Sequence, residues 1–140
     1  MCLTGGFALA MSADPTVVAP VLSQPSLPFA LSKRHKADVG VTAEDLATVV
    51  KRTREDGLCM IGLRFTGDKL APGERFETLR RALGDAFVAV EIDSSRGNPH
   101  GFKKGAHSVL TEELSDEPEH PTNDALQLVL DYFRTRLLGA

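Results

Sequence analysis

Apolar runs of strand type alternate along this chain with amphipathic helical segments, and this alternation constrains the fold more than any other feature. The apolar runs lie at 17–22, at 58–65 ("LCMIGLRF") and at 87–93 ("FVAVEID"), and the helical segments lie at 4–11, 42–57, 72–85 and 122–139. Strand and helix in alternation are typical of a parallel sheet with helices packed against it. The chain therefore predicts an α/β fold with about three parallel strands.

The helical segments carry boundary signals. Thr42 is predicted to cap one helix and Gly57 to end it, Pro72 to open the next, and Thr122 to cap the last. The apolar residues at helical spacing in the last segment predict its inner face: Leu126, Val129, Leu130, Phe133 and Leu137.

Residues 23–41 show no clear periodicity and are predicted to form a long connection. Connections of that length are uncommon in compact domains and often border a functional site. Within it, the basic cluster Lys33-Arg34-His35-Lys36 has no interleaved aromatic residue. This cluster is typical of a solvated loop, and we expect no functional role for His35.

Size and composition limit the possible classes of protein. The 140 residues are 42% hydrophobic and 25% charged, which predicts one folded domain over 1–140. A net charge of −3 disfavours nucleic acid or an anionic membrane surface as the partner. No apolar run approaches the roughly 20 residues of a membrane span, and Cys2 and Cys59 do not form a disulfide framework. We therefore expect a cytoplasmic protein.

Candidate catalytic side chains follow the ends of the predicted strands. Asp68 comes directly after the second apolar run, and His100 and His107 follow the third. Cys2 stands directly before a helix, where a strand would end if one preceded it. Ligands of parallel sheets bind beyond the carboxyl ends of the strands. The order nucleophile, acid, histidine is that of the α/β-hydrolase triad.

The chemistry of these residue types is consistent with that order. A cysteine at a helix N-terminus meets free N–H groups and the positive end of the helix dipole, which favour the thiolate. The Leu3 N–H follows the nucleophile and can donate to an oxyanion. A histidine would carry the proton, with Asp68 holding its tautomer. Cys59, inside an apolar run, is predicted to be an inert core thiol.

Four short motifs make the resemblance more specific. "MCLTGG" resembles the nucleophile elbow of the dienelactone hydrolase family, "FTGDKLAP" its acid turn, and "PHGF" and "AHSVL" its histidine turn. The resemblance implies the C-terminal half of an α/β-hydrolase fold and a Cys-Asp-His triad. The implied activity is hydrolysis of a small-molecule ester or lactone through a thioester acyl-enzyme.

Two histidines compete for the third position of the triad. His100 follows Asp68 at a spacing usual for the family, whereas His107 lies at the expected distance before the C-terminal helix. We prefer His107 narrowly, and His100 stays open. His120 lies in the acidic segment 112–121 and is predicted to belong to a solvated loop. No cofactor and no metal are expected, since no ligand-type cluster and no phosphate-binding glycine motif are present.

The sequence departs from the family pattern at two places. Thr4 stands where the elbow has glycine, and its Cβ is expected to crowd the turn, with the glycines displaced to Gly5 and Gly6. The strand that would precede Cys2 is absent, so we expect 1–140 to be a partial domain without its N-terminal half. Such a chain is expected to have weak activity or none, and to self-associate through an exposed sheet edge.

Two other functions remain open. The chain can be a small non-catalytic α/β domain that binds a partner through the 23–41 connection. A redox sensor based on Cys2 is disfavoured, because no resolving cysteine is near in sequence. Rapid alkylation of Cys2 by iodoacetamide at neutral pH would favour the hydrolase over the binding domain.

Overall fold

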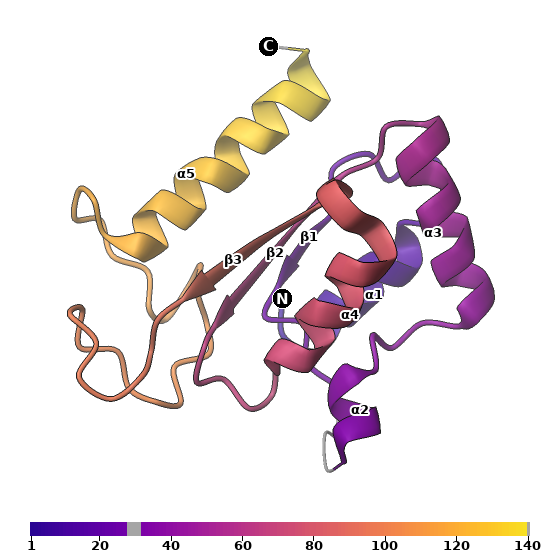
Figure 1. The fold of residues 1–140 in the computed structure, drawn as a ribbon. Coiled ribbons are helices and arrows are strands. Elements are labelled where there is room, and N and C mark those ends of the chain that lie inside the picture. The colour runs from indigo at the N-terminus through magenta and orange to yellow at the C-terminus, as the bar shows by residue number, and fades with distance from the viewer. Residues whose placement is uncertain (28–31, 140) are drawn as a thin grey trace.

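Three parallel strands in the order β1–β2–β3 form one sheet, with helices on both faces (Figure 1). The structure is a computed structural model that describes residues 1–27 and 32–139. The helices are α1 (Leu3–Met11), α2 (Lys33–Ala37), α3 (Ala43–Glu55), α4 (Gly73–Leu83) and α5 (Pro121–Phe133), and the strands are β1 (Val21–Ser23), β2 (Met60–Phe65) and β3 (Phe87–Ile92). Two helical turns, η1 (Gly84–Ala86) and η2 (Arg134–Leu138), follow α4 and α5. The prediction of an α/β fold with three parallel strands is confirmed.

The two faces of the sheet have separate cores. Helices α1, α3 and α4 cover one face, where Met60 packs, and α5 covers the other, where Leu63 and Phe65 pack (Figure 1). Every residue of β2 is buried, as its continuous apolar run predicts for a central parallel strand. Gly62 faces the α4 side, where a Cβ would overlap the Phe87 ring.

The predicted boundaries of α3 and α4 hold closely. The Thr42 hydroxyl accepts a hydrogen bond from the Asp45 N–H at 3.0 Å and caps α3, and Gly57, with a φ of 63°, follows its end. Pro72 is the N-cap of α4 and not its first helical residue. Within the described residues, no helix has both the length and the apolar character that a membrane crossing requires.

The connection after β1 differs from the prediction. The basic cluster forms α2, a helix of five residues, and not a solvated loop. Ser32 caps this helix by accepting a hydrogen bond from the His35 N–H at 3.2 Å. A helix of little more than one turn is too short to show a 3.6-residue period in the sequence. Residues 28–31 of the predicted connection lie outside the described residues.

The last helix also begins and ends differently. His120 is its N-cap and accepts from the Thr122 N–H, so Thr122 is a buried residue of the first turn and not the cap. Val129 is buried as predicted, but Leu137 is 58% exposed. The predicted inner face is wrong at that end, because the helix changes to η2 at Arg134 and the regular 3.6-residue phase is lost.

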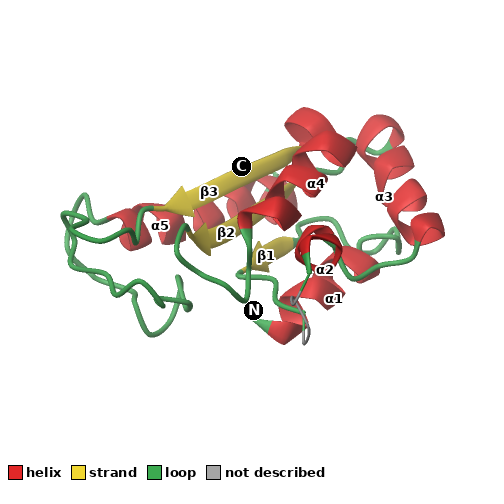
Figure 2. Cartoon of the chain, turned by 60° about the horizontal axis from the view of Figure 1, so that its bottom comes forward, coloured by secondary structure: helices red, strands yellow, loops and turns green. Residues whose placement is uncertain are grey.

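The N-terminus lies beside the carboxyl end of β1 (Figures 1 and 2). The Gln24 N–H donates to the Leu63 carbonyl of β2 at 2.7 Å, so the preceding residue, Ser23, turns its backbone to the outer edge of the sheet. The Cys2 N–H donates to the Ser23 carbonyl on that edge at 3.1 Å. This bond places Cys2 at the same end of the sheet as the loops that follow β2 and β3.

Candidate active site

Cys2, Asp68 and His107 meet beyond the carboxyl ends of the strands. His107 Nε2 lies 3.1 Å from Cys2 Sγ, and His107 Nδ1 lies 2.6 Å from Asp68 Oδ2. The imidazole therefore bridges a thiol and a carboxylate through its two ring nitrogens. These side chains come from the start of α1, from the loop after β2 and from the loop after β3.

The backbone of Cys2 is in a conformation that residues other than glycine rarely adopt. Its φ is 54° and its ψ is −131°, and it is the N-cap of α1. The Cys2 carbonyl accepts hydrogen bonds from the N–H groups of Gly5 at 2.8 Å and Ser26 at 3.1 Å, which hold the turn from both sides. Strained residues at a sharp turn before a helix are a feature of nucleophile elbows.

Glycine is required at position 5 and not at position 4. Thr4 is exposed, and its hydroxyl donates to the Met1 carbonyl at 2.6 Å, so the expected crowding of the turn does not occur. A Cβ on Gly5 would lie 3.0 Å from the Ser23 carbonyl oxygen and 3.1 Å from Pro25 Cα. Gly5 therefore allows α1 to approach β1 and the loop that follows it.

Asp68 is 5% exposed and is held by a turn of its own loop. Its Oδ1 accepts from the Leu70 N–H at 2.8 Å, which leaves Oδ2 for His107. A Cβ on the preceding Gly67 would lie 2.5 Å from the Lys104 carbonyl oxygen. The loop of Asp68 and the loop of His107 thus touch at a point where only glycine fits.

His107, and not His100, lies against Asp68. The His100 side chain is exposed, and its ring lies 5.0 Å from the His120 ring and 5.9 Å from the Phe102 ring, measured between centroids. His120, predicted to be in a solvated loop, caps α5 and packs on Phe102 at 5.4 Å. The two competing histidines of the sequence therefore have different surroundings, and only His107 contacts a thiol.

The contacts shift the pKa values of the thiol and the imidazole in opposite directions. The Ser26 hydroxyl and then His107 hold the pKa of Cys2 below its ordinary value of 9.0, against the effect of burial. Burial alone would lower the pKa of His107, but its hydrogen bonds to Cys2 and Asp68 raise it above its ordinary 6.5. Both shifts favour the thiolate–imidazolium pair.

Two further groups contact the sulfur. The Leu3 N–H, in the first turn of α1, hydrogen-bonds to it and also lowers the pKa of Cys2. Ser26 Oγ lies 3.4 Å from Cys2 Sγ. Sequence reasoning predicted Leu3 near the reacting atoms but missed Ser26, which lies in the connection that has no periodic pattern.

A hollow of about 390 Å³ adjoins the triad. Its lining comes from the loops after β2 and β3: Gly67, Asp68, Lys69, Leu70, Lys104, Gly105 and His107. These loops extend beyond the strand ends (Figure 2). A space of this volume accommodates a small organic molecule beside Asp68 and His107, although Cys2 is not among the lining residues.

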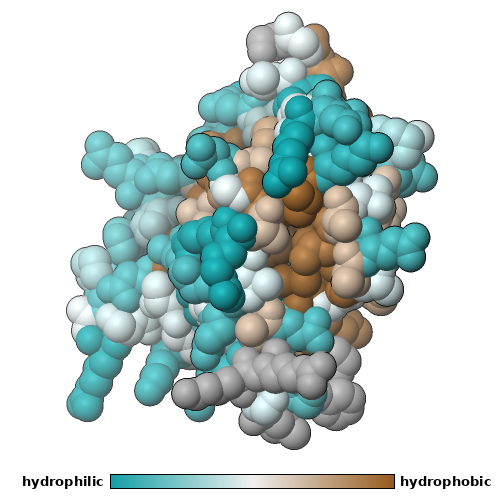
Figure 3. Space-filling model, turned by 45° about the vertical axis from the view of Figure 1, so that its right-hand side comes forward, coloured by the Kyte–Doolittle hydropathy of each residue, from teal (hydrophilic) through white to brown (hydrophobic). Residues whose placement is uncertain are grey.

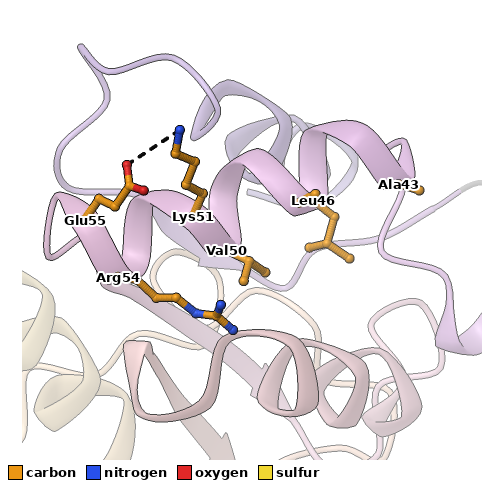
Figure 4. Close-up of a pocket in the computed structure, with 7 residues that line it drawn as sticks. Ala43, Leu46, Val50, Lys51, Arg54 and Glu55 are labelled. Atoms are coloured by element: carbon orange, nitrogen blue, oxygen red, sulfur yellow. Dashed lines mark ion pairs between the residues drawn. The ribbon is translucent and has the colours of Figure 1, made fainter.

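A larger hollow of about 540 Å³ lies along α3, away from the triad. Apolar surface gathers in a depression between hydrophilic side chains on this side of the molecule (Figure 3). Leu46 and Val50 provide apolar lining, and the pair Lys51–Glu55, 3.7 Å apart, lies at its border (Figure 4). The lining contains no cysteine, serine or histidine, and Lys51 and Glu55 in it form an ion pair with each other.

Cys59 is not a core residue, contrary to the prediction. It is partly exposed and directly precedes β2, which begins at Met60. Its carbonyl accepts a hydrogen bond from the Tyr132 hydroxyl at 2.6 Å. The apolar run therefore extends past the amino end of the strand, at the opposite end of the sheet from Cys2.

Among residues 1–27 and 32–139, no three His, Cys, Asp or Glu side chains converge as they would around a metal ion. Comparisons of the chain with protein-family models, with curated proteins and with solved structures find no match. A function for this site therefore has to follow from its own geometry.

Proposed function

We propose that this chain is a thiol hydrolase of ester or lactone bonds. Cys2 is the nucleophile, His107 transfers the proton and Asp68 orients His107. The observation that carries the proposal is the pair of distances at the imidazole, 3.1 Å to the thiol and 2.6 Å to the carboxylate. A nucleophile within hydrogen-bond reach of a base, which is itself oriented by a third group, is the arrangement of covalent catalysis.

The reaction follows from these contacts in two stages. The Cys2 thiolate attacks the carbonyl carbon, and the electron pair of the C=O bond moves to its oxygen, to which the Leu3 N–H donates. Collapse of this intermediate breaks the C–O bond, and the leaving alkoxide takes the proton from His107 Nε2. Water then attacks the thioester while Nε2 takes its proton, and the carboxylic acid leaves as the thiolate reforms.

The arrangement of the strands supports a relation to the dienelactone hydrolase family. Chain order and spatial order agree across the sheet, and the turns with Cys2, Asp68 and His107 lie at one end of it. We propose that the chain corresponds to the C-terminal half of an α/β-hydrolase fold. The substrate class that follows is a small ester or lactone, for which the hollow of about 390 Å³ has room.

Hydrolysis of p-nitrophenyl acetate and of a small lactone tests this proposal. Turnover of this partial fold is expected to be weak. We expect Cys2→Ala to abolish it and His107→Ala to reduce it about 100-fold or more, since positioned proton transfer contributes that much. His100→Ala is the matched control and should retain the wild-type rate, because His100 contacts neither Cys2 nor Asp68. Turnover that survives Cys2→Ala would contradict the role of Cys2, and a wild-type chain without any turnover would support the alternative, a non-catalytic α/β binding domain.

A further inference from the structure

Ser26 contacts the reacting sulfur from a buried position. It is 6% exposed, and its Oγ lies 3.4 Å from Cys2 Sγ. Its backbone N–H donates to the Cys2 carbonyl at 3.1 Å, so the residue is attached to the elbow at two points. The hydroxyl has no other hydrogen-bonding partner among the residues that the structure describes.

The backbone that carries Ser26 is fixed from two directions. Gly5 allows Pro25 to pack closely against α1, because a Cβ on Gly5 would lie only 3.1 Å from Pro25 Cα. The buried guanidinium of Arg75 donates from Nη1 to the Pro25 carbonyl at 2.6 Å and to the Leu70 carbonyl at 3.1 Å. One cation therefore joins the loop of Ser26 to the loop of Asp68.

The direction of the hydrogen bond follows from the other partners of the sulfur. His107 gives the hydrogen on Nδ1 to Asp68, and in the imidazolium form it gives the one on Nε2 to Cys2. The Leu3 N–H also donates to the sulfur. A thiolate accepts a hydrogen bond from each of these groups, whereas a thiol also carries an S–H group that would have to donate to one of its neighbours. In the thiolate form, therefore, the Ser26 hydroxyl is a donor.

We propose that Ser26 is a fourth residue of the active site, whose hydroxyl donates to the Cys2 sulfur and maintains a resting thiolate before substrate binds. The catalytic role of Ser26 in this inference rests on the proposed function. The nucleophile is then already ionised in the free protein, and His107 is already protonated for the leaving group. Once the sulfur is acylated it becomes a poor acceptor, so the Ser26 bond favours the free thiolate over the thioester.

The titratable groups around the sulfur are few. His107 faces it from the loop after β3, and Asp68 stands behind that ring from the loop after β2. The amino group of Met1 adjoins Cys2 in the chain and donates to the Thr4 hydroxyl at 3.2 Å. Ser26 is neutral, so its removal changes a hydrogen bond and leaves the charge of the site unaltered.

The pH dependence of Cys2 alkylation by iodoacetamide tests the role of Ser26. In a Cys59→Ser background, we expect Ser26→Ala to raise the midpoint of the rate profile by about one pH unit, the effect of one lost hydrogen bond to a charged group. Ser12→Ala is the matched control. Ser12 is equally buried in the cap of α1, but its hydroxyl donates to the Ala8 carbonyl at 2.6 Å and does not contact the sulfur.

A second pair of variants separates the hydroxyl from the shape of the side chain. Ser26→Thr keeps the hydroxyl and should keep the midpoint of the rate profile. Ser26→Val has the shape of threonine without the hydroxyl and should raise the midpoint as Ser26→Ala does. If Ser26→Ala does not fold, the comparison of the midpoints of the Thr and Val variants tests the proposal on its own. Equal midpoints for the Thr and Val variants, or an equal rise in Ser12→Ala, would overturn the proposal. Alkylation requires no ester turnover, so this result is independent of whether the chain hydrolyses esters.

Discussion

At the scale of single residues, His107 contacts a carboxylate through one ring nitrogen and a thiol through the other, and both contacts favour its charged form. Asp68 accepts from Nδ1 at 2.6 Å, and the Cys2 sulfur lies 3.1 Å from Nε2. The pKa of Cys2 is lowered and that of His107 is raised, and both shifts favour the ion pair over the neutral pair. Its stabilisation is lost as the pH falls through the pKa of Cys2 and as it rises through that of His107.

The first prediction is the pH profile of Cys2 alkylation in the otherwise unaltered site. With Cys59→Ser as background, the midpoint should lie below the ordinary thiol value of 9.0, because Ser26 and His107 stabilise the thiolate. His107→Ala should move the midpoint upward. Rates of iodoacetamide labelling from acid to alkaline pH measure both. A midpoint at 9.0 in the parent protein would show that no thiolate is stabilised.

The second prediction concerns Gly67, which lies between the loops of Asp68 and His107. Gly67→Ala places a Cβ 2.5 Å from the Lys104 carbonyl oxygen, so the loops must separate and the contact between the carboxylate and the imidazole is lost. We expect ester turnover to fall to the level of His107→Ala, with a loss of about 1–3 kcal/mol in the free energy of unfolding.

Gly105→Ala is the control for this substitution, because no atom lies within 4 Å of its Cβ position although Gly105 borders the same hollow. Turnover and urea denaturation of both variants make the comparison. Equal turnover in the two variants would contradict the requirement for close contact between the loops.

At the scale of elements, the approach of α1 to β1 depends on one glycine of an adjacent pair. A Cβ on Gly5 meets backbone atoms at 3.0 and 3.1 Å, whereas a Cβ on Gly6 finds its nearest atom, Leu27 Cδ2, at 3.7 Å. The third prediction is that Gly5→Ala destabilises the fold by about 1–3 kcal/mol. Gly6→Ala should be neutral or stabilising, since alanine is the better helix former. Urea denaturation measures the free energy of unfolding of both variants. Equal losses in the two would contradict the close packing of Gly5 against β1 and its loop.

The elements with strong local signals could be predicted from the sequence. Thr42 caps α3 with its hydroxyl, and the run that contains β2 is apolar because that strand is buried on both faces. Helix α2 was missed because its five residues show no period, and the end of α5 because the helix changes to η2. Boundaries of this kind depend on tertiary packing, which local patterns do not encode.

Prediction of the site had the same limit. Cys2 and Asp68 stand out because each lies at a turn beside a helix or strand, and His107 could be chosen over His100 only by its distance from the last helix. Ser26 has no local pattern and meets Cys2 only because β1 brings its loop back to the N-terminus. Contacts between distant loops require the folded arrangement of the strands.

At the scale of the whole molecule, the sheet has an open edge at β1. The outer face of α1 beside it exposes Leu3, Phe7 and Met11, at 50%, 61% and 61%, with a spacing of one helical turn. Open edges and apolar stripes favour association of chains. The fourth prediction is concentration-dependent self-association with a second copy through this face, as measured by sedimentation equilibrium.

Phe7→Glu should weaken that association, because it places a charge in the middle of the stripe. Leu138→Glu is the control, since Leu138 is 77% exposed but lies in η2, at the end of α5. Association weakened equally by both substitutions, or by Leu138→Glu alone, would contradict an interface on α1.

The central claim is that Cys2 forms a thioester with the acyl group of a substrate, and peptide mass mapping after acid quenching tests it most directly. After brief exposure to p-nitrophenyl acetate, we expect one acetyl group on the peptide that contains Cys2, a slower appearance in His107→Ala, and loss of the group as hydrolysis proceeds. Acetyl groups on Cys59 or on lysines at the same rate, or a Cys2 peptide that stays unmodified, would contradict the account.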